Sequence, residues 1–584
     1  MEAYFTAIIV IILIISLYKN LLKPSLIFIL AVFLLIIAQV ITVEDFLLGL
    51  ANKQIVVIFL LMILTSGLRT ALGNDFFFRL FKKNLSPFSF RLRMMALVAS
   101  VSSLLNNTPV VAFMIPYVKS WTDEQNYPAS KFLIPLSFAT ILGGMITVVG
   151  TSTNLVLNGL ISQQNLSLLK FTDFFFLGLL VTITGILYLA FFSDKFLPEH
   201  RDNKETVMEQ IKDYIVETFV AKNSPLIGKT IQEAGLRHLK ELFLVEIKRG
   251  DRLITPVDPS RILQESDRLY FTGNTHSILR LINEKNGLKI SEDSHISKNK
   301  FFKLSEAIIP TGSSLIGQTL KSCDFRDTYK GSVISVYRNR EKVSGNLGEI
   351  KLTAGDLLLM LVSEEKDYSE HWKDLILLQK KGNVEKKIEW KSKWNIILTV
   401  LLLLLGITGI LDLFLAVLMG ILLQIIGKLT NLSSIKNALD LDLLVILICA
   451  LAIGTAIRSS GAADLFVNTI TNLNPNLPSW SNIAILFITT LILTSIITNA
   501  AAVSIMFPIA YQMAELHSHH TTPYFVAIAF AASADFITPI GYQTNLMVMG
   551  PGNYAFKDYT KIGLPLTIIY SIIVLTFINY YYQL

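Results

Sequence analysis

Two apolar stretches near the carboxyl end are interrupted by polar and helix-breaking residues, and they constrain the fold more than any other feature. Residues 494–508 and 532–550 are apolar enough to lie in a bilayer, yet hydroxyl, amide, Gly and Pro residues cluster in the middle of each. Lipid offers no hydrogen-bond partners, so an interrupted helix persists at membrane depth only where protein buries it or where it lines a cavity. The two stretches therefore predict a buried polar site inside a bundle of membrane helices.

The composition is typical of a polytopic membrane protein. Of the 584 residues 52% are hydrophobic and 16% are charged, and most of the charged residues lie in one block at 200–389. We expect about ten membrane crossings plus a re-entrant hairpin in each half, because the interrupted stretches around Asn106 and Thr498 are too short for two crossings of about 20 residues each. Two cysteines, Cys323 and Cys449, are too few for a disulfide framework.

The distribution of basic residues predicts the orientation. The net charge of +7 is better explained by cationic loops beside membrane helices than by a nucleic-acid partner. With the amino terminus outside, the basic loops, including the cluster at 79–93, all fall on the inner side. We therefore expect a multi-pass protein of the cell (inner) membrane, with both termini outside and residues 200–389 in the cytoplasm.

The two apolar halves match each other. Ser102 and Asn107 match Thr494 and Asn499 at a shift of 392, and Thr147-x-x-Gly150 matches a Thr-x-x-Gly sequence at a shift of 391. Five crossings per half is an odd number, so the second copy must be inverted relative to the first. Inverted repeats with broken helices that meet near the membrane midplane are typical of secondary transporters.

The charged block is itself duplicated. The sequence SPLIGKT (224–230) recurs as SSLIGQT (313–319), at a shift of 89, and both copies contain short β-like runs between Gly and Asp turns. Two α+β modules follow from this pattern. We expect four domains: a first transmembrane repeat at 1–199, modules at 200–292 and 293–389, and a second transmembrane repeat at 390–584.

The polar interruptions suit ion binding. Asn, Ser and Thr side chains and freed carbonyls at helix breaks supply oxygen ligands to sodium, while the amino ends of half-helices offer N–H groups to an anion. No nucleophile–base arrangement or phosphate loop supports an enzyme. Asp535 has no counterpart in the first half, where Gly144 takes the matching place. It is either a cation or proton site or a residue with a supporting role at the end of a span.

At these residues the two halves resemble the divalent anion/sodium symporter family of the ion transporter superfamily. The motifs that carry the resemblance are the tips NNT (106–108) and TNA (498–500) and the breaks GTSTN (150–154) and GYQTN (541–545). The charged block resembles two RCK carboxy-terminal (TrkA-C) domains, each with an S-x-L-I-G-x-T start. The combination is similar to the sulfate-transporter-like branch, often labelled sulfur-deprivation-response or anion permease proteins.

The resemblance implies two sodium sites and a substrate site. The sodium ligands would be Ser102, Asn106, Asn107, Gly150, Thr494, Thr498, Asn499 and Gly541. The anion would contact Asn107, Thr108, Thr151, Asn154, Asn499, Ala500, Tyr542 and Asn545. Ala500 lacks the hydroxyl that dicarboxylate-transporting members have at this position, which favours a small inorganic dianion such as sulfate.

The expected function is sodium-coupled import of a divalent anion by an elevator-like mechanism. A dicarboxylate or other oxyanion symporter and a transporter-like sensor of anion availability are the alternatives. The RCK-like modules imply a homodimer and a nucleotide effector, and no organic cofactor is expected. The expected partners are membrane lipid, the anion and sodium.

Overall fold

The computed structural model describes most of the chain, and it divides into two compact units. Unit 1 comprises Met1–Glu199 and Lys380–Leu584, and unit 2 comprises His200–Gln379. Arg79, Lys82 and Lys83 of the basic cluster lie outside the described residues. The described residues are 2–19, 22–72, 85–200, 215–236, 242–250, 252–254, 257–258, 260–273, 287–290, 302–310, 313–329, 331–338, 341–343, 347–363, 374–378, 390–427, 429, 435, 439, 441–473, 479–516 and 520–583.

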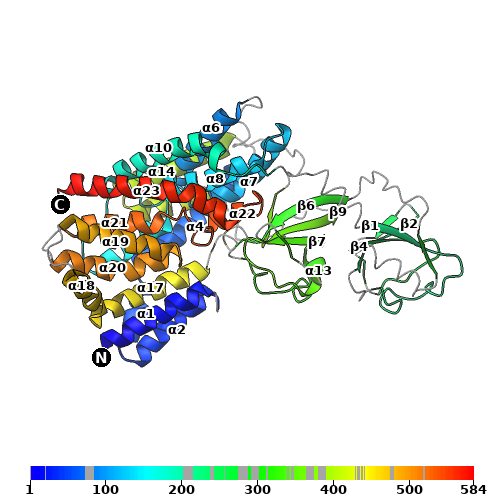
Figure 1. The fold of residues 1–584 in the computed structure, drawn as a ribbon, viewed down its shortest axis with the longest axis horizontal. Helices are drawn as coiled ribbons and strands as arrows, with labels where there is room; N and C mark the ends of the chain where they lie inside the picture. Colours follow the sequence, from blue (N-terminus) through cyan, green and yellow to red (C-terminus); the bar gives the residue numbers. More distant parts are fainter. Residues whose placement is uncertain are drawn as a thin grey trace. The chain divides into compact units, whose positions relative to one another are not determined.

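Unit 1 is helical, with one series of helices before unit 2 in the sequence and one after it (Figure 1). The first series is α1 (Glu2–Tyr18), α2 (Pro24–Ile37), α3 (Val43–Leu50), α4 (Lys53–Leu72), α6 (Pro87–Ser102), α7 (Asn107–Glu124), η1 (Ala129–Lys131), α8 (Leu133–Gly144), α9 (Ser152–Gln163) and α10 (Phe171–Phe196). The second series is α14 (Trp390–Ile407), α15 (Leu413–Ile426), α17 (Leu441–Ser459), α18 (Ala462–Leu473), α19 (Ser479–Thr494), α20 (Asn499–Leu516), α21 (Thr521–Ser533), α22 (Gln543–Met549) and α23 (Phe556–Tyr582).

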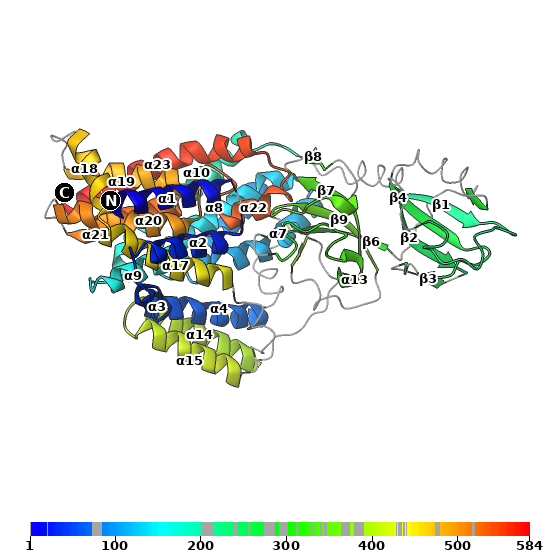
Figure 2. The same cartoon turned by 90° about the horizontal axis from the view of Figure 1, so that it is seen from below.

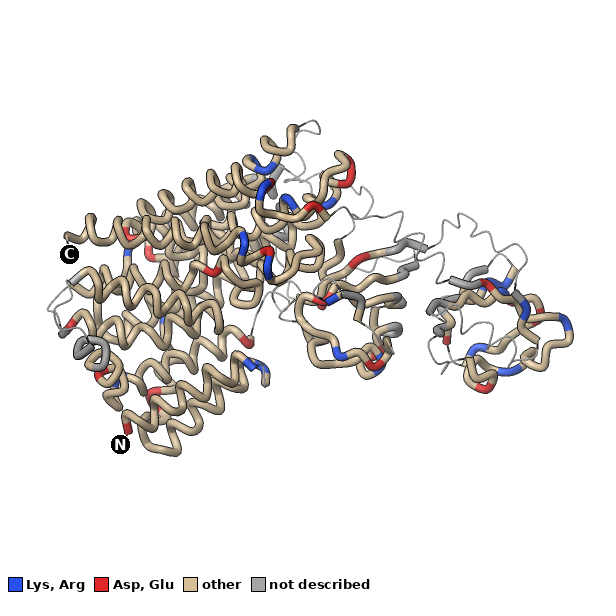
Figure 3. Tube along the Cα trace, viewed as in Figure 1, with Lys and Arg blue, Asp and Glu red and all other residues tan. Residues whose placement is uncertain are grey.

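Several of these helices are suited to a membrane. Among the described residues, four segments are long and apolar enough to cross one: Val43–Leu68, which joins α3 to α4, Phe171–Phe196, Leu441–Ser459 and Phe556–Tyr582. Shorter apolar helices accompany them, and Figure 3 shows few charged residues along the helices of unit 1. The outer helices expose large apolar side chains such as those of Phe33, Phe191 and Ile426. Such a surface is suited to lipid rather than to water.

The helices at the centre of unit 1 are almost fully buried. Every residue of α8 is buried, and so is α21 from Pro523 to Ser533. α8 packs on α6 and α7, and α21 packs on α19 and α20. α9 contacts α20 and α21, while α22 contacts α7 and α8. The short helix after each break therefore packs on two helices of the other series. The long helices α10 and α23 lie side by side (Figures 1 and 2).

Local sequence explains where several helices begin. Pro87 opens α6, and the hydroxyl of Ser86 before it accepts the backbone N–H of Ser89 at 3.3 Å. Asp412 caps α15 by accepting two backbone N–H groups. Both satisfy donors that the first turn of a helix otherwise leaves unpaired. Asp412 also pairs with Lys53 at 2.7 Å, which connects the amino ends of α15 and α4.

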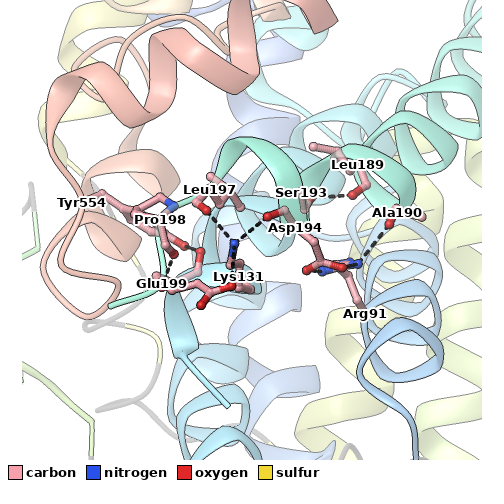
Figure 4. Close-up of polar contacts among 11 residues, drawn as sticks. Arg91, Lys131, Leu189, Ala190, Ser193, Asp194, Leu197, Pro198, Glu199 and Tyr554 are labelled. Atoms are coloured by element: carbon pink, nitrogen blue, oxygen red, sulfur yellow. Dashed lines mark hydrogen bonds and ion pairs between the residues drawn. The ribbon is translucent and has the colours of Figure 1, made fainter. Parts of the chain in front are cut away.

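A polar cluster fixes the carboxyl end of α10 to α6 and η1 (Figure 4). The buried guanidinium of Arg91 forms two hydrogen bonds with the Asp194 carboxylate, at 2.5 and 2.7 Å, and a third with the Ala190 carbonyl at 3.0 Å. The ammonium of Lys131 donates to the carbonyls of Asp194 and Leu197 at 2.6 and 2.7 Å. These bonds satisfy carbonyl groups that the end of a helix leaves without intrahelical partners.

Unit 2 contains two five-stranded antiparallel sheets. The first has the order β3-β2-β4-β1-β5, with β1 (Ile215–Val220), β2 (Leu242–Arg249), β3 (Arg252–Ile254), β4 (Arg268–Gly273) and β5 (Leu288–Ile290). The second has the order β10-β6-β9-β7-β8, with β6 (Phe302–Ile308), β7 (Gly331–Arg338), β8 (Glu341–Lys342), β9 (Leu357–Ser363) and β10 (Ile376–Leu377). Two short helices, α13 (Phe325–Tyr329) and η2 (Leu347–Glu349), accompany the second sheet.

The same contacts occur at matching positions of both sheets of unit 2. Arg249 binds the fully buried carboxylate of Asp267 through Nε at 2.7 Å, and Arg338 binds Asp356 at the same distance. The second guanidinium nitrogen of each arginine donates to a main-chain carbonyl, that of Ile262 or of Lys351, at 2.8 Å. These bonds give each buried carboxylate the paired positive charge that burial requires.

Candidate ion and substrate site

The first candidate site begins at the tip between α6 and α7, where the helix ends at Ser102 and restarts at Asn107. The Ser102 hydroxyl lies against the Asn107 side-chain oxygen and also donates to the Thr140 carbonyl at 2.8 Å. A hydroxyl has one hydrogen, so it satisfies only one of these two acceptors at a time. Three oxygen atoms therefore meet here with a single proton between them.

The break between α8 and α9 is held against this tip. The Thr147 hydroxyl donates to the Ser103 carbonyl at 2.5 Å and accepts the backbone N–H of Gly150 at 3.0 Å. The Asn154 side chain donates to the Thr147 carbonyl at 3.0 Å. From the sequence we expected the break at 150–154, whereas the structure places it at 145–151 and begins α9 at Ser152. Thr147 explains the shift because its hydroxyl bonds the Ser103 carbonyl and the Gly150 N–H, which takes the place of helical hydrogen bonds in this segment.

The second series repeats these contacts. The Thr494 hydroxyl lies 2.9 Å from the Asn499 side-chain oxygen and 2.7 Å from the Ala532 carbonyl, and its one hydrogen serves either acceptor. These three residues match Ser102, Asn107 and Thr140 of the first series. Thr538 lies 3.4 Å from the Ser495 carbonyl, and Asn545 donates to the Thr538 carbonyl at 3.2 Å. The matching residues therefore face each other at the second tip and break, but the Thr538 hydroxyl lies farther from its carbonyl than the Thr147 hydroxyl does in the first series.

A glycine lies close to each tip. A Cβ atom at Gly150 would be 2.8 Å from the Ser102 carbonyl oxygen, and one at Gly541 would be 2.7 Å from that of Thr494. Both distances are too short for a real carbon–oxygen contact, so only glycine lets the backbone of the break approach the tip this closely. Each close approach adds a main-chain carbonyl to the oxygen atoms of its site.

The two sites are linked through the first tip. The amide nitrogen of Asn107 donates to the Tyr542 phenol oxygen, which also bonds Thr151. Thr108 donates to the Gln543 side-chain oxygen at 3.0 Å. The structure places the second break at 534–542, earlier than the expected 541–545, because α22 begins at Gln543. These contacts therefore bring the last residue of the break and the first residue of α22 onto the tip between α6 and α7.

The second tip differs from the first in what covers it. Within the described parts of the chain, the buried amide nitrogen of Asn499 has no hydrogen-bond partner, and Ala500 has no hydroxyl where the first tip has Thr108. The two sites therefore share their oxygen clusters but differ in the groups around them.

The structure brings most of the predicted site residues together in the interior. Ser102, Asn107, Thr151, Asn154, Thr494, Asn499, Ala500 and Asn545 are buried, Asn106, Thr108, Gly541 and Tyr542 are half-buried, and Thr498 is exposed. Gly150 is buried as well. Asn545 donates to the carbonyls of Asp535 and Thr538 and accepts from Ser137, so its side chain is fully used inside the protein.

Sequence reasoning missed Ser137 and Tyr559. The Ser137 hydroxyl donates to the Asn545 side-chain oxygen at 2.7 Å and lies 2.8 Å from the Thr544 hydroxyl, and Tyr559 donates to the Asn545 carbonyl at 2.6 Å. Ser137 and Thr140 are the hydroxyl residues of the apolar helix α8, and no local pattern distinguishes Ser137. Its partners belong to the other half of the chain, so only the packing of α8 on α22 reveals its role.

The oxygen atoms gathered at each tip are suited to bind an alkali cation. Each cluster consists of hydroxyl, amide and main-chain oxygens, which hard cations prefer over nitrogen and sulfur ligands. Within the part of the chain that the structure describes, no group of three or more His, Cys, Asp or Glu side chains gathers as a transition metal would require.

The comparisons with known proteins agree with a helical membrane carrier. The profile of the citrate transporter (CitMHS) family matches residues 8–524. The chain is 31% identical, over 94% of its own length and 97% of the relative's, to a Chlamydomonas reinhardtii protein named "Putative sulfur deprivation response regulator". It is also 31% identical to an uncharacterized transporter of Synechocystis sp., over 93% of this chain and 91% of the other. Sodium/sulfate cotransporter 2 of Chlamydomonas reinhardtii is 26% identical over 61% of this chain and 42% of its own.

The fold, the buried oxygen clusters and these matches define a multi-pass membrane transporter rather than an enzyme. The chain belongs to the citrate transporter family, and its relatives include sodium/sulfate cotransporters.

Proposed function

We propose that the protein imports a divalent anion, with sulfate as the preferred substrate, coupled to sodium. The observation that carries the proposal is the matched pair of oxygen clusters at Ser102 and Thr494, each with more acceptor oxygens than protons. Relatives named sodium/sulfate cotransporters support the choice of both ions.

The two series of helices are proposed to form an inverted repeat that moves its core like an elevator. The recurrence of tip and break contacts at matching positions of the two halves supports the repeat. An odd number of crossings in each half would place the copies in opposite orientations. The hairpins and broken helices would then carry the ions between the two sides of the cell membrane, with both termini outside.

We assign one sodium ion to each cluster and the anion to the space between them. Ser102, Asn106, Asn107 and Gly150 would serve the first ion, and Thr494, Thr498, Asn499 and Gly541 the second. Asn107, Thr108, Thr151, Asn499, Ala500 and Tyr542 would contact the anion directly. Asn154 and Asn545 would act on the anion indirectly by holding the breaks, since both donate to main-chain carbonyls of the breaks.

The choice of sulfate over a dicarboxylate depends on Ala500. This buried residue offers no hydroxyl to a carboxylate, while the tip of the first hairpin presents Thr108. Without this hydroxyl the second tip has one hydrogen-bond donor fewer for a carboxylate group, so the proposal favours a small inorganic dianion such as sulfate.

Charge accounting sets the number of sodium ions. Moving a charge of −2 inward against about −100 mV costs roughly 4.6 kcal/mol, at about 2.3 kcal/mol per charge. Two sodium ions would cancel this electrical cost, and a third would make import electrogenic and favourable. The clusters at Ser102 and Thr494 account for two.

A panel of substrates and cations on the purified protein in proteoliposomes tests the proposal. Labelled sulfate, molybdate, succinate and citrate would each be offered with an inward gradient of sodium, potassium or protons. We expect sulfate uptake to require sodium. Uptake that is indifferent to both sodium and proton gradients would contradict coupling, and a preference for citrate or succinate would contradict the choice of substrate.

A sensor of anion availability is the second candidate, because the C. reinhardtii relative is named for a response to sulfur deprivation. In this view the two sheets of unit 2 are cytoplasmic RCK-like modules that pair in a homodimer and bind an effector of the nucleotide class. Deleting residues 200–389 separates the two candidates. Sulfate uptake with altered rate and unchanged selectivity supports regulated transport, whereas a wild-type rate of uptake combined with loss of effector binding supports sensing.

A further inference from the structure

Asp535 is a fully buried carboxylate inside the second break. Within the described residues its Oδ2 atom has no hydrogen-bond partner, and its Oδ1 atom receives only the Thr538 hydroxyl, at 3.4 Å. That distance is well beyond the roughly 2.5–3.0 Å of an ordinary O–H···O hydrogen bond. No ion pair to Asp535 occurs in the same part of the chain.

The unpaired carboxylate points into the second oxygen cluster. Oδ2 of Asp535 is the atom that a Cβ at Gly541 would meet first, and the Thr494 carbonyl oxygen is close behind, at 2.7 Å from the same Cβ position. The carboxylate therefore lies where the tip and the break approach each other. It is in the same place as the oxygen atoms assigned to the second cation.

The first series shows what this position faces when no carboxylate is present. Gly144 is the counterpart of Asp535 there, and a Cβ at Gly144 would be 2.9 Å from the Asn107 side-chain oxygen and 3.1 Å from the Gly150 carbonyl oxygen. A side chain at this position is thus directed into the oxygen cluster in both series. Only the second series places a charge there.

A buried carboxylate without a partner is unfavourable by several kcal/mol, and proteins compensate it with a positive charge. Because neither a basic side chain nor a short hydrogen bond from the described residues compensates Asp535, the charge must be balanced by a proton or by a bound cation, and the oxygen atoms gathered around this carboxylate favour a metal cation. The unpaired amide nitrogen of Asn499 belongs to the same cluster. In the first series, by contrast, the Asn107 amide nitrogen is bonded to Tyr542.

We propose that the Asp535 carboxylate is a direct ligand of the coupling sodium ion in the second cluster, together with Thr494, Asn499 and the backbone at Gly541. The inference rests on the proposed sodium coupling and adds that the two cation sites are unequal. The second site is neutral when it holds one sodium ion, whereas the first has a charge of +1. The second site is therefore the tighter of the two, and its sodium ion offsets the repulsion between Asp535 and an anionic substrate.

Sodium-dependent thermal stability of the purified full-length protein tests this inference without relying on transport. Wild type, Asp535→Asn and the control Asp464→Asn would be unfolded in choline chloride with increasing sodium chloride at constant ionic strength. Asp464 lies in α18 and is not part of the tip or the break. We expect Asp535→Asn to need at least about tenfold more sodium for half-maximal stabilisation, because one full charge is lost at ligand distance. Asp464→Asn should match wild type.

The sodium-free measurement separates a ligand from a structural residue. Without sodium, Asp535→Asn should melt at a higher temperature than wild type, because the unpaired charge is gone, and saturating sodium should reverse this order. A variant that melts lower than wild type without sodium and keeps its sodium midpoint within twofold would overturn the inference. A variant that keeps its sodium midpoint and loses only a dependence on pH would overturn it too, in favour of a proton. If Asp535→Asn does not fold, Asp535→Gly, which copies Gly144, is read in the same way.

Uptake measured on the same proteins keeps the two proposals apart. Suppose that sodium stabilises wild type while no anion in the panel shows sodium-driven uptake. That result would contradict the proposed function but still support a sodium site at Asp535. If sulfate uptake is driven by sodium and Asp535→Asn has the same sodium midpoint as wild type, the inference about Asp535 is wrong and the proposed function is supported. Wild type that sodium does not stabilise would overturn the inference.

Discussion

The hydroxyls of Ser102 and Thr494 face the same two kinds of acceptor, although they belong to opposite halves of the chain. Each hydroxyl is directed at the side-chain oxygen of an asparagine five positions later and at a main-chain carbonyl 38 positions later. A Ser and a Thr differ by a methyl group, so what the two positions share is the hydroxyl. This places the hydroxyl, rather than the size of the side chain, at the centre of each cluster.

Removing either hydroxyl should weaken sodium binding. We expect Ser102→Ala and Thr494→Val each to raise the sodium concentration for half-maximal sulfate uptake by about fivefold or more, the equivalent of one lost oxygen contact. Ser100→Ala is the matched control, since the Ser100 hydroxyl is exposed and bonds only the Ala96 carbonyl of its own helix. Equal sodium dependence in Ser100→Ala and Ser102→Ala would show that the Ser102 hydroxyl does not bind sodium.

Adding a hydroxyl at the second tip should change substrate preference. Ala500→Thr restores the side chain that Thr108 supplies in the first tip, and one new hydrogen bond of about 1 kcal/mol should favour succinate relative to sulfate about fivefold. Ala500→Val has the same shape without the hydroxyl and serves as the control. Competition of unlabelled succinate against labelled sulfate measures the ratio. A similar ratio in both variants would show that volume, and not hydrogen bonding, acts at this position.

The ion pair between Arg91 and Asp194 should respond asymmetrically to mutation. The Arg91 side chain is 1% exposed and that of Asp194 is 65% exposed, so only Asp194 can reach solvent if its partner is lost. We expect Asp194→Asn to lower stability by about 1–3 kcal/mol, since it leaves a buried charge short of a partner, and Arg91→Met to lower it less. Thermal unfolding in detergent measures the order. Glu199→Gln, at an exposed residue 3.5 Å from Lys131, is the control with little expected effect.

Cys323 should react slowly with alkylating reagents. Partial burial raises the pKa of this thiol, and only the thiolate is nucleophilic, so the reactive fraction near neutral pH is smaller than that of a free cysteine. The rate should rise about tenfold per pH unit until the raised pKa is reached. Mass spectrometry of iodoacetamide-treated Cys449→Ser protein measures it. A rate equal to that of a free cysteine peptide would mean that the packing around Cys323 in unit 2 opens readily.

The sequence predicted well where α7 and α20 begin, and it predicted the positions of the two helix breaks less well. Polar residues in an apolar run predict an interruption, and α7 does begin at Asn107 and α20 at Asn499. The break after α8 begins at Met145, ahead of the expected Gly150. Its position depends on the bond from Thr147 to the Ser103 carbonyl, a contact between two segments that no local pattern contains.

Contacts between the two series could not be predicted at all. The bond from Asn107 to Tyr542 joins the first tip to the second break, and that from Ser137 to Asn545 joins α8 to α22. The matching motifs in the two halves indicate which residues are equivalent, but equivalence does not say which residues touch. The direction of Asp535 is of the same kind: the sequence marks it as unmatched, and only the structure shows that its carboxylate is unpaired among the described residues and faces Gly541.

Simultaneous uptake of labelled sodium and labelled sulfate into proteoliposomes tests the central claim most directly. With the membrane potential clamped and an inward sodium gradient imposed, sulfate should accumulate above its outside concentration, and at least two sodium ions should enter with each sulfate. The Ser102→Ala/Thr494→Val double variant should lose this accumulation. Sulfate that merely equilibrates, at the same rate with sodium or choline outside, would contradict the account.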